Sequence, residues 1–242
     1  MLGKIFGAGL GWVLGGGPIG AVIGLAIGSA FDKAGSENEI EQNPRQQTQA
    51  GDFNVSLVIL SAAVMKADGK ILKSELDFVK QFFVRSFGQG MANEQVQLLK
   101  EVLKQELNLN QIAAQIRVSM RINEKRLIMQ YLFGIAQADG HIADSEIHVL
   151  QQIARGIGIS ASEFLSMRAM FSGAANNIND YKVLGLSKSA TNEQIKKAYR
   201  QLVIKNHPDK VAHLGENHVE AAKQKFQKIQ SAYSNLKKER GL

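Results

Sequence analysis

The sequence of 242 residues contains no cysteine. A disulfide framework, a thiolate zinc site and a cysteine nucleophile are therefore excluded, and this composition fits a reducing compartment. Charge is also missing locally, because no charged residue occurs from residue 5 to residue 31. The chain as a whole is nevertheless not disordered, since 45% of its residues are hydrophobic and 21% are charged, and its length is sufficient for one or two globular domains.

The uncharged stretch predicts a membrane anchor in residues 1–31. About 27 helical residues at about 1.5 Å each would exceed the roughly 30 Å hydrocarbon core of a bilayer. Pro18 would kink such a span or divide it into two short segments. A glycine recurs every four residues, so a helix through residues 5–31 would have a face that allows close approach between copies. We therefore predict membrane contact through residues 5–31 and a homo-oligomer through this face: Gly16, Gly20, Gly24 and Gly28.

The same stretch has other interpretations. Lys4 and the small residues 28–30 fit a secretory signal peptide, but the apolar run is long for one. A soluble apolar hairpin is a further alternative. Residues 15–20 match the G-x-G-x-x-G dinucleotide fingerprint, but they follow no predicted strand, so we treat the match as chance. The flanking basic residues do not determine orientation across a membrane.

Two polar segments divide the rest of the chain. Residues 32–52 and residues 172–179 have too little apolar surface to bury and are predicted to be linkers. Between them, residues 53–171 have an all-helical pattern that we expect to form a bundle of about seven helices. The predicted helices of this bundle cover residues 55–65, 76–87, 93–107, 110–120, 127–135 and 147–157.

The bundle contains an internal repeat, because the motif of residues 67–75 (ADGKILKSE) returns at residues 138–146 (ADGHIADSE). Each copy lies between two apolar helices, so the unit is helix, loop, helix. Within the loops we expect Asx turns, positive φ at glycine, an isoleucine that pins the loop to the core and a serine N-cap. These roles fall on Asp68 and Asp139, Gly69 and Gly140, Ile71 and Ile142, and Ser74 and Ser145.

This doubled motif resembles the TerB family, named for tellurite resistance, and the resemblance implies an all-helical fold. It also implies a divalent metal site at the acidic positions Asp68, Glu75, Asp139 and Glu146. Such sites need about six oxygen ligands, and the spacing is not that of the twelve-residue calcium loop. We therefore expect no metal and no cofactor. A metal-binding stress-response protein acting through this domain is the alternative function.

The basic excess lies near the C-terminus. The net charge is +7, and residues 180–242 carry 13 basic and 6 acidic side chains, which accounts for all of it (13 − 6 = 7). A field of this kind suggests an acidic partner surface, with nucleic acid second. Because exposed aromatic residues for base stacking are lacking, we expect no nucleic acid partner.

A helical hairpin is predicted in residues 180–242. A short helix near residues 181–185 precedes a second that Thr191 can cap and that runs to Asn206, where Pro208 forces an end. A third helix covers residues 219–238. The tight turn between the second and third helices holds His207, Pro208 and Asp209.

This segment resembles the J domain, the co-chaperone module that stimulates ATP hydrolysis by DnaK-type chaperones. The matching residues, in order, are Tyr181, Leu184, Gly185, the run 195–200, the tripeptide 207–209, Phe226, Ile229, Ala232 and Tyr233. The resemblance implies that His207, Pro208 and Asp209 engage the chaperone. It implies further that basic side chains steer the domain onto an acidic surface, namely Lys196, Lys197, Arg200 and Lys210.

The order of anchor, TerB-like domain and J domain resembles the DjlA-type family of membrane-anchored co-chaperones. We therefore expect a co-chaperone that is not itself an enzyme, with a TerB-like domain for client, partner or self-association. Its predicted place is the inner (cytoplasmic) membrane, single-pass, with both domains facing the cytoplasm. A metal enzyme using His207, Asp209, His213 and His218 is the competing class.

Overall fold

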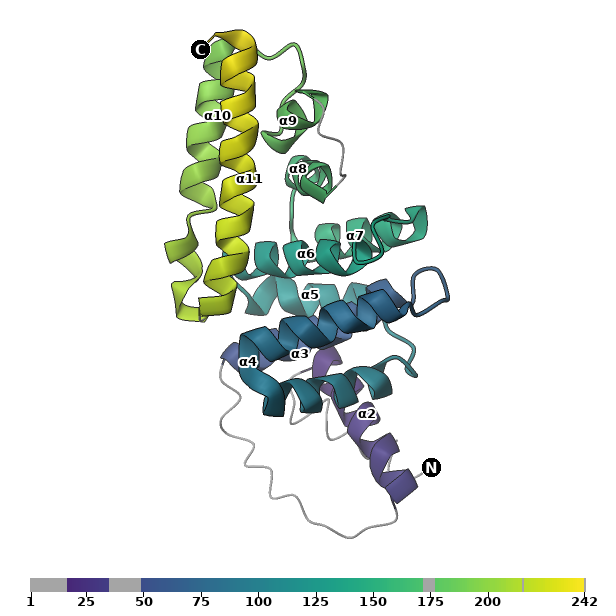
Figure 1. Ribbon diagram of the computed structural model, residues 1–242. Helices are drawn as coiled ribbons and strands as arrows, with labels where there is room; N and C mark the ends of the chain where they lie inside the picture. Colours follow the sequence, from purple (N-terminus) through teal and green to yellow (C-terminus); the bar gives the residue numbers. More distant parts are fainter. Residues whose placement is uncertain (1–16, 35–48, 172–176, 215, 242) are drawn as a thin grey trace.

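The computed structural model describes residues 17–34, 49–171, 177–214 and 216–241, and within these ranges every regular element is a helix (Figure 1). The predicted all-α class is confirmed. The elements are α2 (Pro18–Ala34), α3 (Gln49–Met65), α4 (Lys73–Val102), α5 (Leu109–Ser119), α6 (Ile122–Ala136), α7 (Asp144–Ile157), α8 (Ala161–Phe171), α9 (Asn177–Val183), α10 (Asn192–Lys205), the 3-10 helix η1 (Pro208–Leu214) and α11 (Glu216–Arg240).

The central bundle is built around α3 and α6. The middle of α3 is apolar on all sides, and residues 57–60 are completely buried; such a pattern is typical of a helix enclosed by others. The long helix α4 is kinked at Gly88, where φ is +78°. Only glycine adopts this conformation without steric cost, so the kink divides α4 into two helical segments. Residues 49–171 therefore hold seven helical segments, as the sequence predicts.

The two repeat loops have the same geometry. Asp68 Oδ1 accepts a hydrogen bond from the N–H of Lys70, and Asp139 Oδ1 accepts one from the N–H of His141, each at 2.9 Å. Gly69 and Gly140 have φ values of +78° and +93°. The predicted Asx turns and positive φ values are confirmed.

The predicted serine caps are wrong. The helices after the loops begin at Lys73 and Asp144, so Ser74 and Ser145 stand one residue inside the helix instead of before it. The capping oxygens belong to the glutamates that follow: Glu75 Oε2 accepts from the N–H of Leu72 at 2.8 Å, and the second copy repeats this bond. Ile71 is half exposed, so it does not pin its loop to the core. Its counterpart in the second copy, Ile142, does pack against the core.

The C-terminal segment forms an antiparallel hairpin of α10 and α11, with α9 beside them (Figure 1). Thr191 Oγ1 accepts from the N–H of Gln194, so Thr191 caps α10 as predicted. The hairpin has its own core, in which Ile195, Ile229 and Leu236 are completely buried. The rings of Tyr199 and Tyr233 stack at 4.0 Å.

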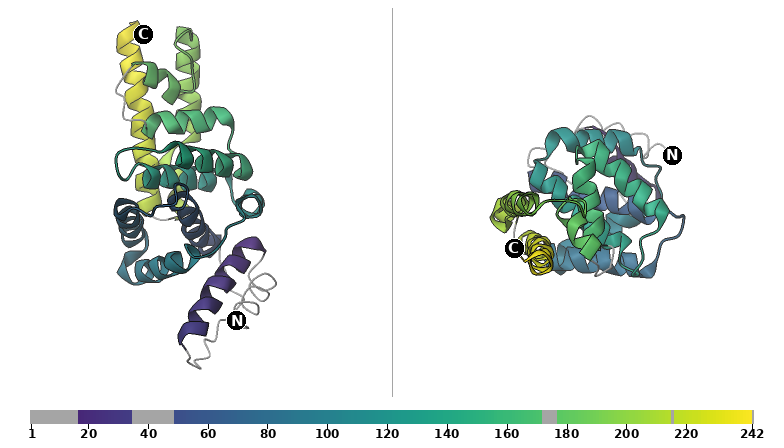
Figure 2. Two further views of the ribbon diagram at one scale, coloured as in Figure 1. Left: turned by 90° about the vertical axis from the view of Figure 1, so that its right-hand side faces the viewer. Right: turned by 90° about the horizontal axis from the view of Figure 1, so that it is seen from above.

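The turn end of the hairpin packs against the bundle, and Figure 2 shows the two parts side by side. Val211 of η1 and Ala222 of α11 are buried in the core of the bundle, while Ala169 of α8 joins the core of the hairpin. Lys228 Nζ donates to the backbone oxygen of Met170 at 2.9 Å. The shared apolar contacts make bundle and hairpin one packed structure.

Helix α2 packs against α4 and α5. Ile19, Val22 and Ala26 are buried there, and the N–H of Ile19 donates to Oε1 of Gln115 at 2.9 Å. Pro18 stands in the first turn of α2, a position where proline fits a helix without loss of a hydrogen bond. Residues 5–16 of the predicted span, which include Gly16, lie outside the described residues. Among the helices that are described, none is both long and apolar enough to cross a membrane.

Candidate partner-binding site

The loop of residues 207–209 begins where α10 ends. Asn206 closes that helix with two hydrogen bonds to the backbone oxygen of Leu202, from its own N–H and from Nδ2. Pro208 then opens η1, whose first turn is closed by the N–H of Lys210 donating to the backbone oxygen of His207 at 3.1 Å. Since proline lacks an N–H and fixes φ, it ends one helix and pre-forms the start of the next.

Two side chains of the loop face solvent. The side chain of His207 is 48% exposed and that of Asp209 is 87% exposed. Nδ1 of His207 accepts from the N–H of Asp209 at 3.4 Å and lies 3.3 Å from Oδ2 of the same residue. The imidazole and the ring of Phe226 on α11 also form a T-shaped pair, with centroids 5.8 Å apart. The loop is therefore held in one shape while its polar groups remain accessible.

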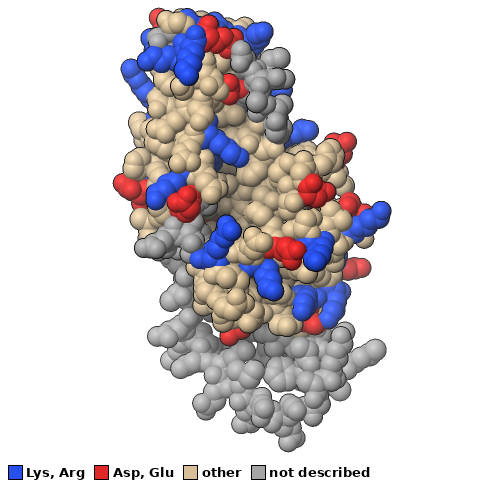
Figure 3. All heavy atoms as spheres, viewed as in Figure 1, with Lys and Arg blue, Asp and Glu red and all other residues tan. Residues whose placement is uncertain are grey.

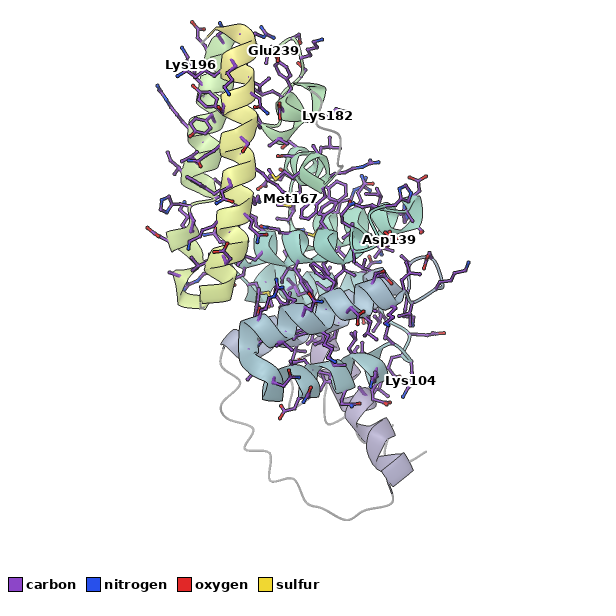
Figure 4. The ribbon with its side chains drawn as sticks, in the orientation of Figure 1. Lys104, Asp139, Met167, Lys182, Lys196 and Glu239 are labelled. Carbon is purple, nitrogen blue, oxygen red and sulfur yellow. The ribbon has the colours of Figure 1, made fainter. Side chains whose placement is uncertain are left out.

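The predicted basic residues are also exposed. Lys196, Lys197 and Arg200 lie on α10, and Lys210 follows the loop on η1. Figure 4 shows Lys196 near the free end of the hairpin, and Figure 3 shows basic side chains gathered over that end. At about 1.5 Å per residue, the surface from Lys196 to His207 is roughly 16 Å long. We call the outward side that carries Lys196, Lys197 and Arg200 the outer face, while Lys210 lies at its turn end and also lines a cavity against the bundle.

The opposite flank of the loop contacts the bundle through charged residues that sequence reasoning did not identify. Glu163 of α8 accepts from Nε of Arg126 at 2.9 Å and from Nζ of Lys205 at 2.7 Å. Burial alone would raise the pKa of Glu163, but the hydrogen bonds from Lys205 and Arg126 together lower it to about 2. This ion network joins α6 and α8 of the bundle to α10, two residues before His207. No sequence motif marks it.

The acidic residues of the two repeat loops are engaged in local structure. Burial raises the pKa of Glu75 to about 7, and the carboxylates of Glu146, Asp68 and Asp139 add to this rise. Burial likewise raises the pKa of Glu146. Within the described part of the chain, no three histidine, aspartate or glutamate side chains are grouped to hold a metal ion. The side chains of His213 and His218 lie outside that part.

Comparison with known proteins accounts for the order of the segments. Three family models match: the transmembrane domain of co-chaperone DjlA over residues 1–46, the tellurite resistance protein TerB over residues 54–169, and the DnaJ domain over residues 179–241. Co-chaperone protein DjlA of Vibrio vulnificus strain CMCP6 is 30% identical over 261 residues, which cover 90% of this chain and 91% of that protein. The chain belongs to the DjlA co-chaperone family.

Further members of the DjlA family align along nearly the whole chain. Co-chaperone protein DjlA of Coxiella burnetii is 28% identical and covers 100% of this chain and 98% of its own length. The protein of the same name from Escherichia coli K12 is 29% identical, with 99% and 98% covered. No solved structure matches the chain. The resemblances to TerB, to the J domain and to the DjlA type are thereby confirmed.

Membership defines the function at a coarse level. The chain is a co-chaperone with a J domain, which implies a DnaK-type partner, and its N-terminal family match implies association with a membrane.

Proposed function

We propose that this DjlA-family co-chaperone stimulates ATP hydrolysis by a DnaK-type chaperone through His207, Pro208 and Asp209. The observation that carries the proposal is the fixed but exposed loop. Its histidine and aspartate are accessible, while Pro208, the contact of His207 with Phe226 and the end of α10 limit its shape. A contact that is ordered before binding loses less conformational entropy on association.

The chemistry of hydrolysis would belong to the partner. The nucleotide, its magnesium ion and the attacking water are held by the chaperone, and this chain makes and breaks no bond itself. Contact with the loop would favour the hydrolysis-competent conformation, and it can do so only by binding that conformation more tightly than the resting one. On this proposal, the chain is not an enzyme.

The outer face would set the rate of encounter. Lys196, Lys197 and Arg200 are exposed on the outer face and Lys210 is exposed beside the loop. None of the four forms an ion pair with a described carboxylate. Their charge is therefore available to an acidic partner. Exposed charges of this kind mainly raise the association rate, and salt weakens their effect.

The membrane arrangement is part of the same proposal. Residues 5–31 would anchor the chain in the inner membrane as a single pass, with both domains in the cytoplasm, where a DnaK-type partner has ATP. Glycines 16, 20, 24 and 28 would let copies associate, and the TerB-like domain would serve a client, a partner or self-association. Protease treatment of intact inside-out vesicles tests this orientation: both domains should be digested, and protection of both would contradict it.

The test of the loop is a single-turnover ATPase assay with the full chain in lipid vesicles and a purified DnaK-type chaperone. Wild type is expected to accelerate hydrolysis, and His207→Gln is expected to lose this effect. His148→Gln, which replaces an exposed histidine on α7, is the matched control and should behave as wild type. No acceleration by wild type, or equal acceleration by His207→Gln, would overturn the proposal.

A further inference from the structure

A basic cleft separates the hairpin from the bundle beside the 207–209 loop. Two adjoining cavities form it, and both are lined by Lys205, Asn206 and Lys225. The first cavity adds Arg126 from α6. The second, of about 180 Å³, opens over Glu163 of α8. The cleft is therefore lined from both domains, by apolar side chains such as Met167 and Leu202 as well as by the cationic side chains.

Lys225 is the unusual residue of this cleft. Its side chain comes from α11 and the residue is only 7% exposed. In the described part of the chain, its ammonium forms neither a hydrogen bond nor an ion pair, since Glu163 is engaged by Arg126 and Lys205. An ammonium with so little access to water and no counter-ion is costly. Burial accordingly lowers the pKa of Lys225 to about 7, and the charges of Arg126 and Lys205 add to this.

The charges of the cleft do not balance. Arg126, Lys205 and Lys225 supply three cationic groups, Lys210 lines the first cavity as a fourth, and Glu163 is the carboxylate among the lining residues. Arg126 uses Nε for Glu163 and Nη1 for Oδ1 of Asn123, which is 2.8 Å away. After the pairing of Glu163 is complete, cationic donors remain around the cavities. An added anion would compensate them and would restore the charge of Lys225.

We propose that this cleft binds a phosphate-type oxyanion through Lys225, Lys205 and Arg126. Guanidinium and ammonium donors that approach from three helices suit a tetrahedral dianion, which accepts hydrogen bonds in several directions. The second cavity, which Lys205 and Lys225 line, has a volume of about 180 Å³ and admits a phosphate group with some of its water, since one water occupies about 30 Å³. Arg126 lines the adjoining first cavity, whose volume is about 20 Å³. Inorganic phosphate and the phosphate of a small monoester share this chemistry.

Such a ligand would brace the two domains. It would connect α6 of the bundle with α10 and α11 of the hairpin, close to the loop, because His207 and Lys210 line the first cavity. The site does not depend on stimulation of a chaperone, so its test is a binding measurement.

The experiment is a calorimetric titration of the full chain in lipid vesicles with inorganic phosphate, with chloride at equal ionic strength as reference. Wild type should bind phosphate saturably and chloride not. Lys225→Met should weaken phosphate binding by at least tenfold, while Lys196→Met, an equal charge change on the exposed outer face, should stay within twofold. Methionine replaces the buried stem of Lys225 at similar length, and thermal unfolding verifies that the variant folds.

Arg126→Gln is the second variant and should also weaken phosphate binding by at least tenfold. Competition with glycerol phosphate separates the two sources: displacement assigns the site to phosphomonoesters, and its failure assigns it to free phosphate. Absence of saturable binding, or equal losses in Lys225→Met and Lys196→Met, would overturn the proposal.

Discussion

The two sides of the α10–α11 hairpin use the same residue type in opposite ways. On the outer face, Lys196 and Lys197 are exposed and have no described partner carboxylate. On the inner side, Lys205 is bound to Glu163 and Lys225 is buried in the cleft. A lysine on the first side can contribute to recognition of another protein, and a lysine on the second contributes to docking within the chain. Location, and not residue type, decides the role.

The hairpin core supports both sides, so its loss should have the largest effect. Ile229 is completely buried between the helices. Replacement by alanine removes buried methyl and methylene groups and leaves a cavity, which typically costs about 2 to 5 kcal/mol. We expect Ile229→Ala to lower the free energy of unfolding of the hairpin by this amount in urea. Gln230→Ala at the exposed neighbouring position is the control, and equal stability of the two variants would contradict the assigned core.

Asp209→Asn should reduce stimulation of the chaperone without changing the stability of the fold. The side chain is 87% exposed, so the substitution removes a charge without disturbing packing. We expect stimulation of the chaperone to fall by about tenfold or more, as for a central contact of an interface, with an unchanged melting temperature. Asp77→Asn, at an exposed position of α4, is the matched control in the same ATPase and melting measurements. Retained stimulation would remove Asp209 from the contact.

The basic residues of the outer face should raise the rate of association with the chaperone. Simultaneous replacement of Lys196, Lys197 and Arg200 by alanine is expected to slow association with the chaperone several-fold at low salt. The difference from wild type should shrink toward 0.5 M salt, because screening suppresses exposed charges. Stopped-flow association measures this.

Three alanines at exposed basic positions of the bundle, Lys73, Lys80 and Lys100, change the net charge equally and serve as control. Equal slowing by both triple variants would mean that net charge, and not the outer face, controls association.

Local signals in the sequence were sufficient for the helices of the hairpin and for the loops. The proline at position 208 fixes the end of α10, the helical period gives the stripe with Ile195 and Tyr199, and the repeated ADG motif gives the two loops. Each depends on neighbours in the chain. The serine caps failed at the same local level, because the helices begin before the serines, at Lys73 and Asp144, and the glutamates at positions 75 and 146 accept from the N–H groups of Leu72 and Ala143.

The inner side was not predictable from the sequence. Glu163, Arg126 and Lys225 belong to three helices that are distant in the chain, and only the packing of Val211 and Ala222 against the bundle brings them together. A lysine that is buried by docking has the same sequence environment as one in solvent. The exposed loop could therefore be predicted as a site, whereas the cleft beside it could not.

Glu163→Gln tests the ion network of the inner side through the dependence of stability on pH. Because the pKa of Glu163 is lowered to about 2 in the folded chain, its ionised form contributes stability above the ordinary carboxylate pKa of 4.5. This stability is lost as the pH falls from about 4.5 through 2. Between pH 5 and pH 3, the advantage of wild type over Glu163→Gln should shrink by about 1 kcal/mol, after allowance for solvent screening.

Urea unfolding at several pH values measures this difference, and Glu94→Gln at an exposed position of α4 is the control that should show no such change. Above pH 5, Glu163→Gln is expected to be less stable than wild type, since glutamine cannot compensate the charges of Arg126 and Lys205. A constant difference from pH 5 to pH 3 would mean that the carboxylate is not paired in solution. In that case the inner side would be as accessible as the outer face, because the ion network is the polar contact that holds Lys205 on the bundle.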